Sequence, residues 1–245
     1  MIRLTILLAL LIALPAAAQT PPASEDLSKD FDKFWEEEEF KDDYLDGTGT
    51  GGGPAMVWRE LDLDAVNQVL AHRGLITLPE KTLNWGGAGW FSMHTGDRLF
   101  VALGGGGYGG AGESQRGDEF SRLSRGAGYF DVKGVLPLHR RLFLEGGLAL
   151  GGGASEVTVE RTITDGSDEA GIIQVHLRGK QLFLLLRPHV GLDLRLARWV
   201  GILAEGGYEL ASGDWTLEGE ATLVDELEFE AGSGPYFALT VRFGI

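Results

Sequence analysis

The chain has 245 residues, no cysteine and a formal net charge of −15. The absence of cysteine excludes thiol nucleophiles, thiolate zinc sites and iron–sulfur clusters. The charge argues against nucleic-acid binding and against docking on an anionic lipid surface, because both require clustered lysine and arginine.

The first eighteen residues have the layout of a secretory signal. Arg3 precedes an apolar run from Leu4 to Leu14, and small residues follow at Ala16 to Ala18. This run is too short, and polar sequence follows it too closely, for a membrane-spanning helix. We therefore expect residues 1–18 to be a cleaved signal peptide of an exported protein; a retained membrane anchor is the alternative.

Residues 19–57 form an acidic segment that begins with two prolines and ends in a glycine-rich run. Such a segment cannot bury enough apolar surface to offset its chain entropy, so we expect a disordered linker. An alternative reading starts from the aromatic residues among its acids, which could fold against a protein partner. These residues are Phe31, Phe34, Trp35 and Phe40.

Residues 58–79 are a lead-in segment that contains one helical pattern, LDLDAVNQVLAHRG. Its apolar face consists of Leu63, Val66 and Leu70. Asp62 or Asp64 can accept from the first free amides, and Gly74 can take the left-handed position after the helix. A helix of about three turns is marginal alone in water, so we expect this one to pack on the following domain.

From residue 80 onward the apolar period changes from 3.6 to 2, which predicts strands. The alternating runs lie near 83–94, 98–110, 125–138, 141–153, 181–196, 198–212 and 234–245. Several have the length that a tilted strand needs to cross a bilayer. An eighth strand lies either in residues 55–61 or in residues 75–79, and the pattern does not choose between them.

The connections between these runs fall into two groups. Short turns occupy residues 95–98, 138–141 and 196–199, whereas long polar connections occupy residues 112–124, 156–180 and 213–234. Short turns at one end and long hairpins at the other are typical of an up-and-down barrel whose short turns face the periplasm. We therefore predict an all-β, antiparallel transmembrane barrel of about eight strands over residues 80–245.

The strand faces sort apolar from charged side chains. In LRPHVGLDLRL, residues 186–196, leucine, proline and valine occupy one face, while charged residues and His189 occupy the other. The same sorting in other runs predicts an interior network whose opposite charges nearly balance, as a narrow filled barrel requires. Its members are Asp131, Lys133, Glu145, Arg187, His189, Asp193, Arg195, Glu205, Glu209 and Arg242. The alternative is a sandwich with a solvated polar face.

The final run, FALTVRFGI, ends at the terminus with an apolar face. That face consists of Phe237, Leu239, Val241, Phe243 and Ile245. It resembles the C-terminal signature of bacterial outer-membrane β-barrel proteins, although it ends in isoleucine rather than an aromatic residue. The resemblance, closest to small OmpA-type or OmpX-type barrels, implies recognition by the barrel-assembly machinery and outer-membrane lipid as a partner.

Gly104, Gly106 and Gly109 match the G-x-G-x-x-G pattern of a nucleotide-binding turn. The third glycine of that motif must open a helix within a β-α-β unit, but further glycines and polar residues follow here. We interpret the stretch as a strand whose glycines leave room for aromatic side chains or for the docked helix. We further hypothesise that the 62–73 helix packs against or plugs these glycine-rich early strands.

The sequence offers little for catalysis, and we predict no enzyme, no cofactor and no metal site. His189 and Asp193 lie about 13 Å apart along one extended strand, too far for a direct dyad. The acids Asp165, Asp168 and Glu169 do not have the spacing of an EF-hand loop.

Two functional classes follow from these patterns. The first is a non-enzymatic outer-membrane barrel with a structural, adhesion or narrow-channel role. The second is a soluble periplasmic or secreted β-domain that binds a ligand or a protein partner.

Overall fold

The computed structural model describes residues 49–94, 99–164, 172–197, 199–219 and 232–244. The strands are β1 (Gly49–Glu60), β2 (Lys81–His94), β3 (Phe100–Arg116), β4 (Glu119–His139), β5 (Leu142–Thr164), β6 (Ile172–Ala197), β7 (Val200–Ser212), β8 (Trp215–Gly219) and β9 (Gly234–Gly244). The helix is α3 (Asp64–His72). The predicted signal peptide, most of the predicted linker, the 165–169 acids and Ile245 lie outside the described residues.

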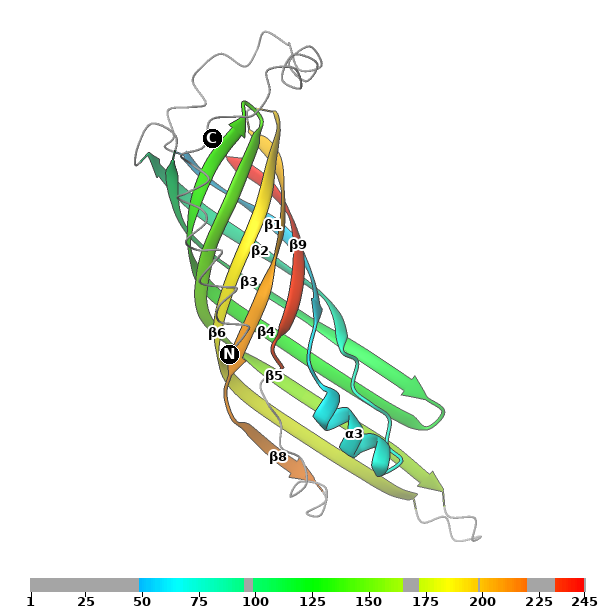
Figure 1. The fold of residues 1–245 in the computed structure, drawn as a ribbon. Coiled ribbons are helices and arrows are strands. Elements are labelled where there is room, and N and C mark those ends of the chain that lie inside the picture. Colours follow the sequence, from blue (N-terminus) through cyan, green and yellow to red (C-terminus); the bar gives the residue numbers. More distant parts are fainter. Residues whose placement is uncertain (1–48, 95–98, 165–171, 198, 220–231, 245) are drawn as a thin grey trace.

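Eight strands form a closed antiparallel ring. Strands β1 to β7 pair in sequence order except at the closure, where β9 pairs with β7 on one side and with β1 on the other. Figure 1 shows these strands tilted around a common axis. The predicted up-and-down barrel is therefore confirmed, and a soluble two-sheet sandwich is excluded, because the ring is one continuous sheet.

The eighth strand is β1, which covers most of the 55–61 alternative; residues 75–79 are not a strand. β1 begins at Gly49, before the predicted end of the linker at residue 57, so the chain enters the barrel earlier than predicted. The period-2 burial from Ala55 to Arg59 marks the inward face of this strand.

The long connections expected at residues 112–124 and 156–180 are instead largely strand. β3 and β4 pair as far as Arg116 and Glu119, and β5 and β6 pair as far as Thr164 and Ile172. The reason is that the alternation continues past the barrel and supports cross-strand pairing. β8 likewise continues the pairing of β7 along β6.

We call the resulting extension the flap, because it leaves the ring at one end. β3 beyond Gly109 has no β2 partner, and β6 before Leu184 pairs with β8 rather than with β7. The flap consists of residues 110–116, 119–126, 153–164, 172–183 and 215–219. Figure 1 shows α3 at the flap end of the molecule, whereas β9 finishes at the opposite end.

Helix α3 follows its sequence pattern with one correction. Val66 and Leu70 are buried, and Gly74 takes the predicted left-handed conformation with φ +69°. The predicted capping by an aspartate is wrong: Leu63 occupies the cap position and no side chain caps the helix. Asp64 instead lies in the first turn, where the positive end of the helix dipole stabilises a carboxylate. None of the described helices is long and apolar enough to cross a membrane.

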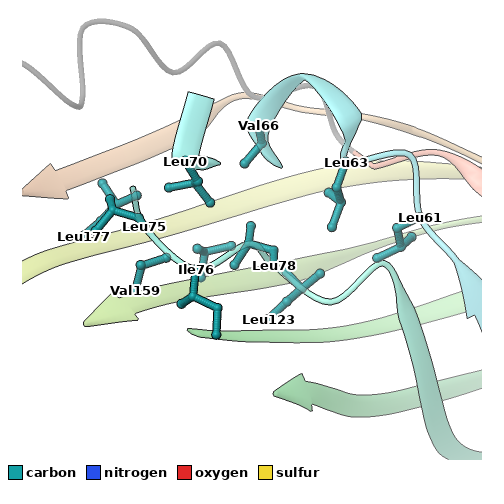
Figure 2. Close-up of a cluster of buried hydrophobic side chains, with 11 residues drawn as sticks. Leu61, Leu63, Val66, Leu70, Leu75, Ile76, Leu78, Leu123, Val159 and Leu177 are labelled. Atoms are coloured by element: carbon teal, nitrogen blue, oxygen red, sulfur yellow. The ribbon is translucent and has the colours of Figure 1, made fainter. Parts of the chain in front are cut away.

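The helix packs on the flap and not on the glycine-rich strands. Its apolar face meets side chains of β4, β5 and β6, as Figure 2 shows. This cluster contains Leu61, Leu63, Val66, Leu70, Leu75, Ile76, Leu78, Leu123, Val157, Val159 and Leu177. The hypothesis that α3 plugs or packs on the early glycine-rich strands is thus not what the structure has, because the apolar face of α3 is buried against inward apolar residues of the flap.

The outer face of the ring is apolar. Its most exposed large side chains include Trp85, Phe91, Phe130, Val132, Leu150, Leu184, Val190, Leu192, Leu196, Trp199, Phe237, Val241 and Phe243. Two aromatic contacts lie on this face: the rings of Trp58 and Phe237 are 5.8 Å apart, and those of Trp199 and Phe243 are 6.2 Å apart. An apolar exterior with aromatic residues is what contact with hydrocarbon selects.

Inward glycines make room for interior aromatic rings, as predicted. A methyl group on Gly106 would lie 2.7 Å from the hydroxyl oxygen of Tyr129, and one on Gly207 would lie 2.8 Å from the ring of Tyr236. Gly104, Gly106 and Gly109 all lie within β3, so the G-x-G-x-x-G match is part of a strand.

Candidate functional site

The barrel interior holds three groups of buried charges, and the first lies toward the short-turn end. Lys133 of β4 donates to Glu145 of β5 at 2.5 Å. Arg242 of β9 bridges Glu145 at 2.6 Å and also contacts Asp193 of β6. Arg195 lies 3.9 Å from Asp193. Four strands are therefore tied together through two carboxylates that are almost fully buried.

The second group lies at mid-barrel and combines charge with aromatic rings. Arg187 of β6 donates to Glu205 of β7 at 2.9 Å, and the hydroxyl of Tyr236 donates to the same carboxylate at 2.7 Å. The Arg187 guanidinium also stacks 3.6 Å from the centre of the Tyr236 ring. His189 Nε2 lies 3.6 Å from Asp131 and 3.8 Å from Glu205.

The third group lies where the ring meets the flap. Glu209 of β7 accepts from Arg125 at 2.8 Å, from Arg59 at 3.2 Å and from the Tyr108 hydroxyl at 2.6 Å. Arg59 also donates to the side-chain oxygen of Asn84 at 2.9 Å. Two guanidinium groups from different strands thus share a single carboxylate.

All ten residues expected inside the barrel lie within 3.9 Å of an ionisable side chain of the opposite type, and the partner of Asp131 is His189. The sequence reasoning missed Arg59, Arg125 and the tyrosines at 108 and 236. The sequence does indicate an inward position for Arg125. It lies an even number of residues from Asp131 in the same strand, so the two side chains share a face. Arg59 fell outside the run chosen as barrel, so its parity was not considered.

The neighbours of His189 could not be predicted from the alternation of side chains along one strand. Sequence spacing compared it with Asp193 on its own strand, but its carboxylate neighbours are Asp131 of β4 and Glu205 of β7. Cross-strand neighbours depend on register and on barrel curvature, which a single strand does not encode. In the described part of the chain, no three His, Asp or Glu side chains form a group that could hold a metal ion.

The interior has little free space. Within the described residues, one interior cavity of about 30 Å³ lies beside Trp90 and Phe143, and another of about 20 Å³ lies beside Tyr129 and Arg187. Each has room for about one or two water molecules, whereas ligand pockets usually measure about 300–1,000 Å³. The buried charges and rings therefore occupy most of the space beside these two cavities in the described part of the barrel.

Larger hollows lie on the outer surface. One of about 970 Å³ spans β3 to β6 and β8 where the flap leaves the ring, and we call it the outer groove. A second, of about 570 Å³, lies beside Trp58, Leu83 and Phe237.

Solved structures similar to the chain include three bacterial outer-membrane proteins. Ail, the attachment invasion locus protein of Yersinia pestis, was solved with the heparin analogue sucrose octasulfate; it matches at 11% identity, covering 81% of this chain and 100% of Ail, with a TM-score of 0.38. CarO2 of Acinetobacter baumannii matches at 12% identity, covering 79% of this chain and 99% of CarO2, with a TM-score of 0.44.

The third is the outer-membrane protease OmpT of Escherichia coli, at 9% identity, covering 82% of this chain and 97% of OmpT, with a TM-score of 0.31. No family model and no curated protein matches the sequence.

The chain folds as an outer-membrane β-barrel. Every strand of its described ring is hydrogen-bonded on both sides, so backbone groups need no water at membrane depth. The outward side chains are apolar, while the charged ones are paired inside. Such a ring is suited to the hydrocarbon of an outer membrane, whereas in water its exposed leucine and tryptophan side chains would favour association.

Proposed function

We propose that this protein is a sealed, non-enzymatic anchor that displays the flap on the cell surface, in a structural or adhesive role. The observation that carries the proposal is the filled interior: paired charges occupy it, and its described cavities measure about 30 and 20 Å³. A barrel built to conduct or to bind a substrate inside would need a continuous open space.

The flap gives the barrel something to display. One face of the flap carries the α3 cluster, so this sheet is packed against the helix and is not a loose loop. Its other face presents charged side chains, among them Arg122 and Arg178. Short turns face the periplasm in barrels of this kind, and this supports a position of the flap outside the cell.

A narrow channel and an enzyme are both less favoured. His189 is the buried histidine of the charge network, and its neighbours Asp131 and Glu205 sit in the filled interior. A substrate could reach this histidine only by displacing the network, which would leave charges buried without partners.

Assembly and partner binding complete the proposal. Phe237, Val241 and Phe243 of β9 face outward, where barrel-assembly machinery could read them as an entering C-terminal strand. We also propose that the acidic segment before β1, which begins at residue 19, binds a protein partner.

The orientation is tested with single cysteines, since the natural chain has none. Asp118→Cys lies in the β3–β4 turn of the flap, and Arg140→Cys lies in the exposed β4–β5 turn at the other end. In intact cells, a membrane-impermeant maleimide should label the first variant, and it should label the second only after permeabilisation. The reverse pattern would place the flap in the periplasm and overturn surface display.

Reconstitution into a membrane tests whether the barrel conducts ions. The purified barrel in planar bilayers should give no recurring conductance steps. Uniform steps that survive repurification would show a channel and contradict the sealed anchor.

A further inference from the structure

The outer groove lies on the outward face of the sheet, where the apolar belt gives way to the flap. The strand register sets three charged or polar side chains in one row across β4, β5 and β6: Arg122, Thr158 and Arg178. The next row toward the ring carries Ser124, Glu156 and Lys180. Three cations thus gather at one end of a hollow of about 970 Å³.

Toward the ring, the floor of the groove has almost no side chains. The next row reads Gly109, Gly126, Ala154 and Leu182 across β3 to β6. The row after it, just beyond the residues that line the groove, reads Gly107, Gly128, Gly152 and Leu184. Bare backbone over three adjacent strands is therefore flanked by two leucines of β6.

Packing does not require several of these outward glycines. A methyl group on Gly109, Gly126 or Gly128 would meet no atom closer than 3.5 Å, which is ordinary contact. Inward Gly106 differs, because its methyl group would lie 2.7 Å from Tyr129. Glycine in a strand interior weakens the strand, so bare positions without an internal reason indicate close approach by something outside.

Leu182 lines the groove at its ring-side end, and further apolar side chains lie just beyond it on the outer face. Trp85 of β2, which pairs with Gly109, is 63% exposed, and Leu182 and Leu184 of β6 are 77% and 74% exposed. Phe130 and Leu150 lie beyond the floor, toward the opposite end of the ring. The hollow therefore changes along its length from cationic to apolar, as an amphipathic lipid does.

We propose that the outer groove binds a phosphate-bearing membrane lipid, with its acyl chains on the glycine floor and its phosphate on Arg122, Arg178 and Lys180. The orientation proposed above places this lipid in the outer leaflet, but binding itself does not depend on that orientation. The chain is acidic overall, yet lipid recognition requires only local complementarity at the depth of the head groups.

Two carboxylates at the cationic end hold the guanidinium groups in place. Glu156 accepts from Arg178 at 2.6 and 2.9 Å, and Glu113 lies 3.6 Å from Arg122. The hydrogen bond from Arg178 lowers the pKa of Glu156, so this carboxyl group stays ionised at neutral pH. Asp214 also lines the groove, and Lys180 supplies the third cation.

The test uses the mature chain, purified in detergent and titrated with lipid A, a bisphosphorylated glycolipid, while native mass spectrometry counts bound lipid. We expect one retained lipid A per barrel and weaker retention of its dephosphorylated form. Arg178→Gln should weaken binding about fivefold, since a cation near anionic lipid contributes about 1 kcal/mol. Gly126→Leu should weaken it about tenfold, because the new side chain displaces roughly two methylene groups of the lipid.

Matched controls lie elsewhere on the outer face. Lys81→Gln removes an exposed cation, and Gly206→Leu fills an outward glycine of β7 whose methyl group would meet nothing closer than 3.8 Å. Both should change binding less than twofold. If Gly126→Leu does not give a heat-modifiable barrel, Ala154→Leu, at the paired position in the groove lining, replaces it with the same expectation.

Several results would overturn the proposal. One is equal lipid binding by groove and control variants. Another is displacement of the lipid by millimolar inorganic phosphate, which would indicate a free-anion site. A third is a barrel dimer that binds no lipid and is lost in Gly126→Leu, which would assign the groove to a second copy. Inverted cysteine labelling with intact lipid binding would reject surface display alone.

Discussion

Glu209 shows how much of this barrel depends on single buried charges. Its carboxylate is almost fully buried and accepts from two guanidinium groups and a tyrosine hydroxyl on three other strands. Taking such charges out of water is costly, and the cost is offset only when partners and hydrogen bonds are complete. The residue therefore contributes to stability mainly by preventing Arg59 and Arg125 from being buried alone.

We predict that Glu209→Ala lowers the free energy of unfolding by about 3–5 kcal/mol, because both guanidinium groups lose their counter-charge. Unfolding by urea in detergent micelles, followed by gel mobility of unboiled samples, measures this change. The control is Glu60→Gln, which removes one side of the exposed pair with Lys81 and should change the free energy by less than about 1 kcal/mol. Equal urea midpoints for Glu209→Ala and Glu60→Gln would mean that Arg59 and Arg125 remain stably buried without the Glu209 carboxylate.

The side chain of Asn67 joins the helix to the segment that leads back to the barrel. It donates to the Leu78 carbonyl at 3.1 Å and accepts from the Leu78 amide at 2.8 Å. It also contacts Glu80 at 3.1 Å. These bonds satisfy backbone groups of an irregular segment that pairs with no strand, so α3 and its return segment form one unit on the flap.

Leu70 should decide whether that unit stays docked, because its side chain is fully buried among flap residues. We predict that Leu70→Ala weakens docking by about 2–5 kcal/mol. Residues 61–79 should then exchange amide hydrogens faster and be cleaved sooner by protease, while the barrel remains heat-modifiable. Gln68→Ala, on the exposed side of α3, should leave both rates unchanged.

If Leu70→Ala leaves exchange in residues 61–79 as slow as in the natural chain, the apolar cluster is not what holds the helix. If the barrel itself loses heat-modifiability, the flap and the ring fold as one cooperative unit rather than as two.

Strands β4, β5 and β6 were the elements whose length the sequence pattern most underestimated. The alternation inside them runs well past the barrel: Leu123, Val157 and Leu177 keep the inward parity in the flap. The polar and charged residues between them made these segments look like loops. Their inward apolar residues are buried because α3 covers them, and a contact from another part of the chain cannot be seen in a local window.

At the level of the whole molecule, β1 and β9 close the ring, and their pairing joins the two ends of the described chain. Outward Trp58 and Phe237 stack across this seam, while inward Arg59 reaches Glu209 on the far side of β9. Closure is what allows the backbone to cross hydrocarbon, because an open edge would leave amide groups without partners.

We predict that a chain shortened to begin at residue 46 still refolds in detergent to a heat-modifiable barrel, because β1 remains whole. A chain shortened to begin at Leu61 should not, since β2 and β9 would then have unpaired edges. Mobility of boiled and unboiled samples on a denaturing gel reports the difference. A folded barrel from the second chain would mean that closure does not require β1, and failure of the first would give the acidic segment a part in folding.

Local periodicity was enough to identify the barrel. In β6, apolar and charged residues alternate from Leu186 to Leu196, and a period of two fixes which side chains share a face wherever the neighbours lie. The same argument selected the ten interior charges. Gly74 at the end of α3 was also predictable, because only glycine adopts a left-handed conformation at little cost.

Tertiary structure alone decided which charges meet and where α3 lies. His189 faces Asp131 and Glu205 because strand register and barrel curvature bring β4, β6 and β7 together, and register is a relation between strands. The helix docks on the flap because Leu123, Val157 and Leu177 are buried only once it covers them. The side of the sheet on which a residue lies depends on its position along one strand. Its contact partners lie on segments distant in the chain, and only the folded molecule brings those segments together.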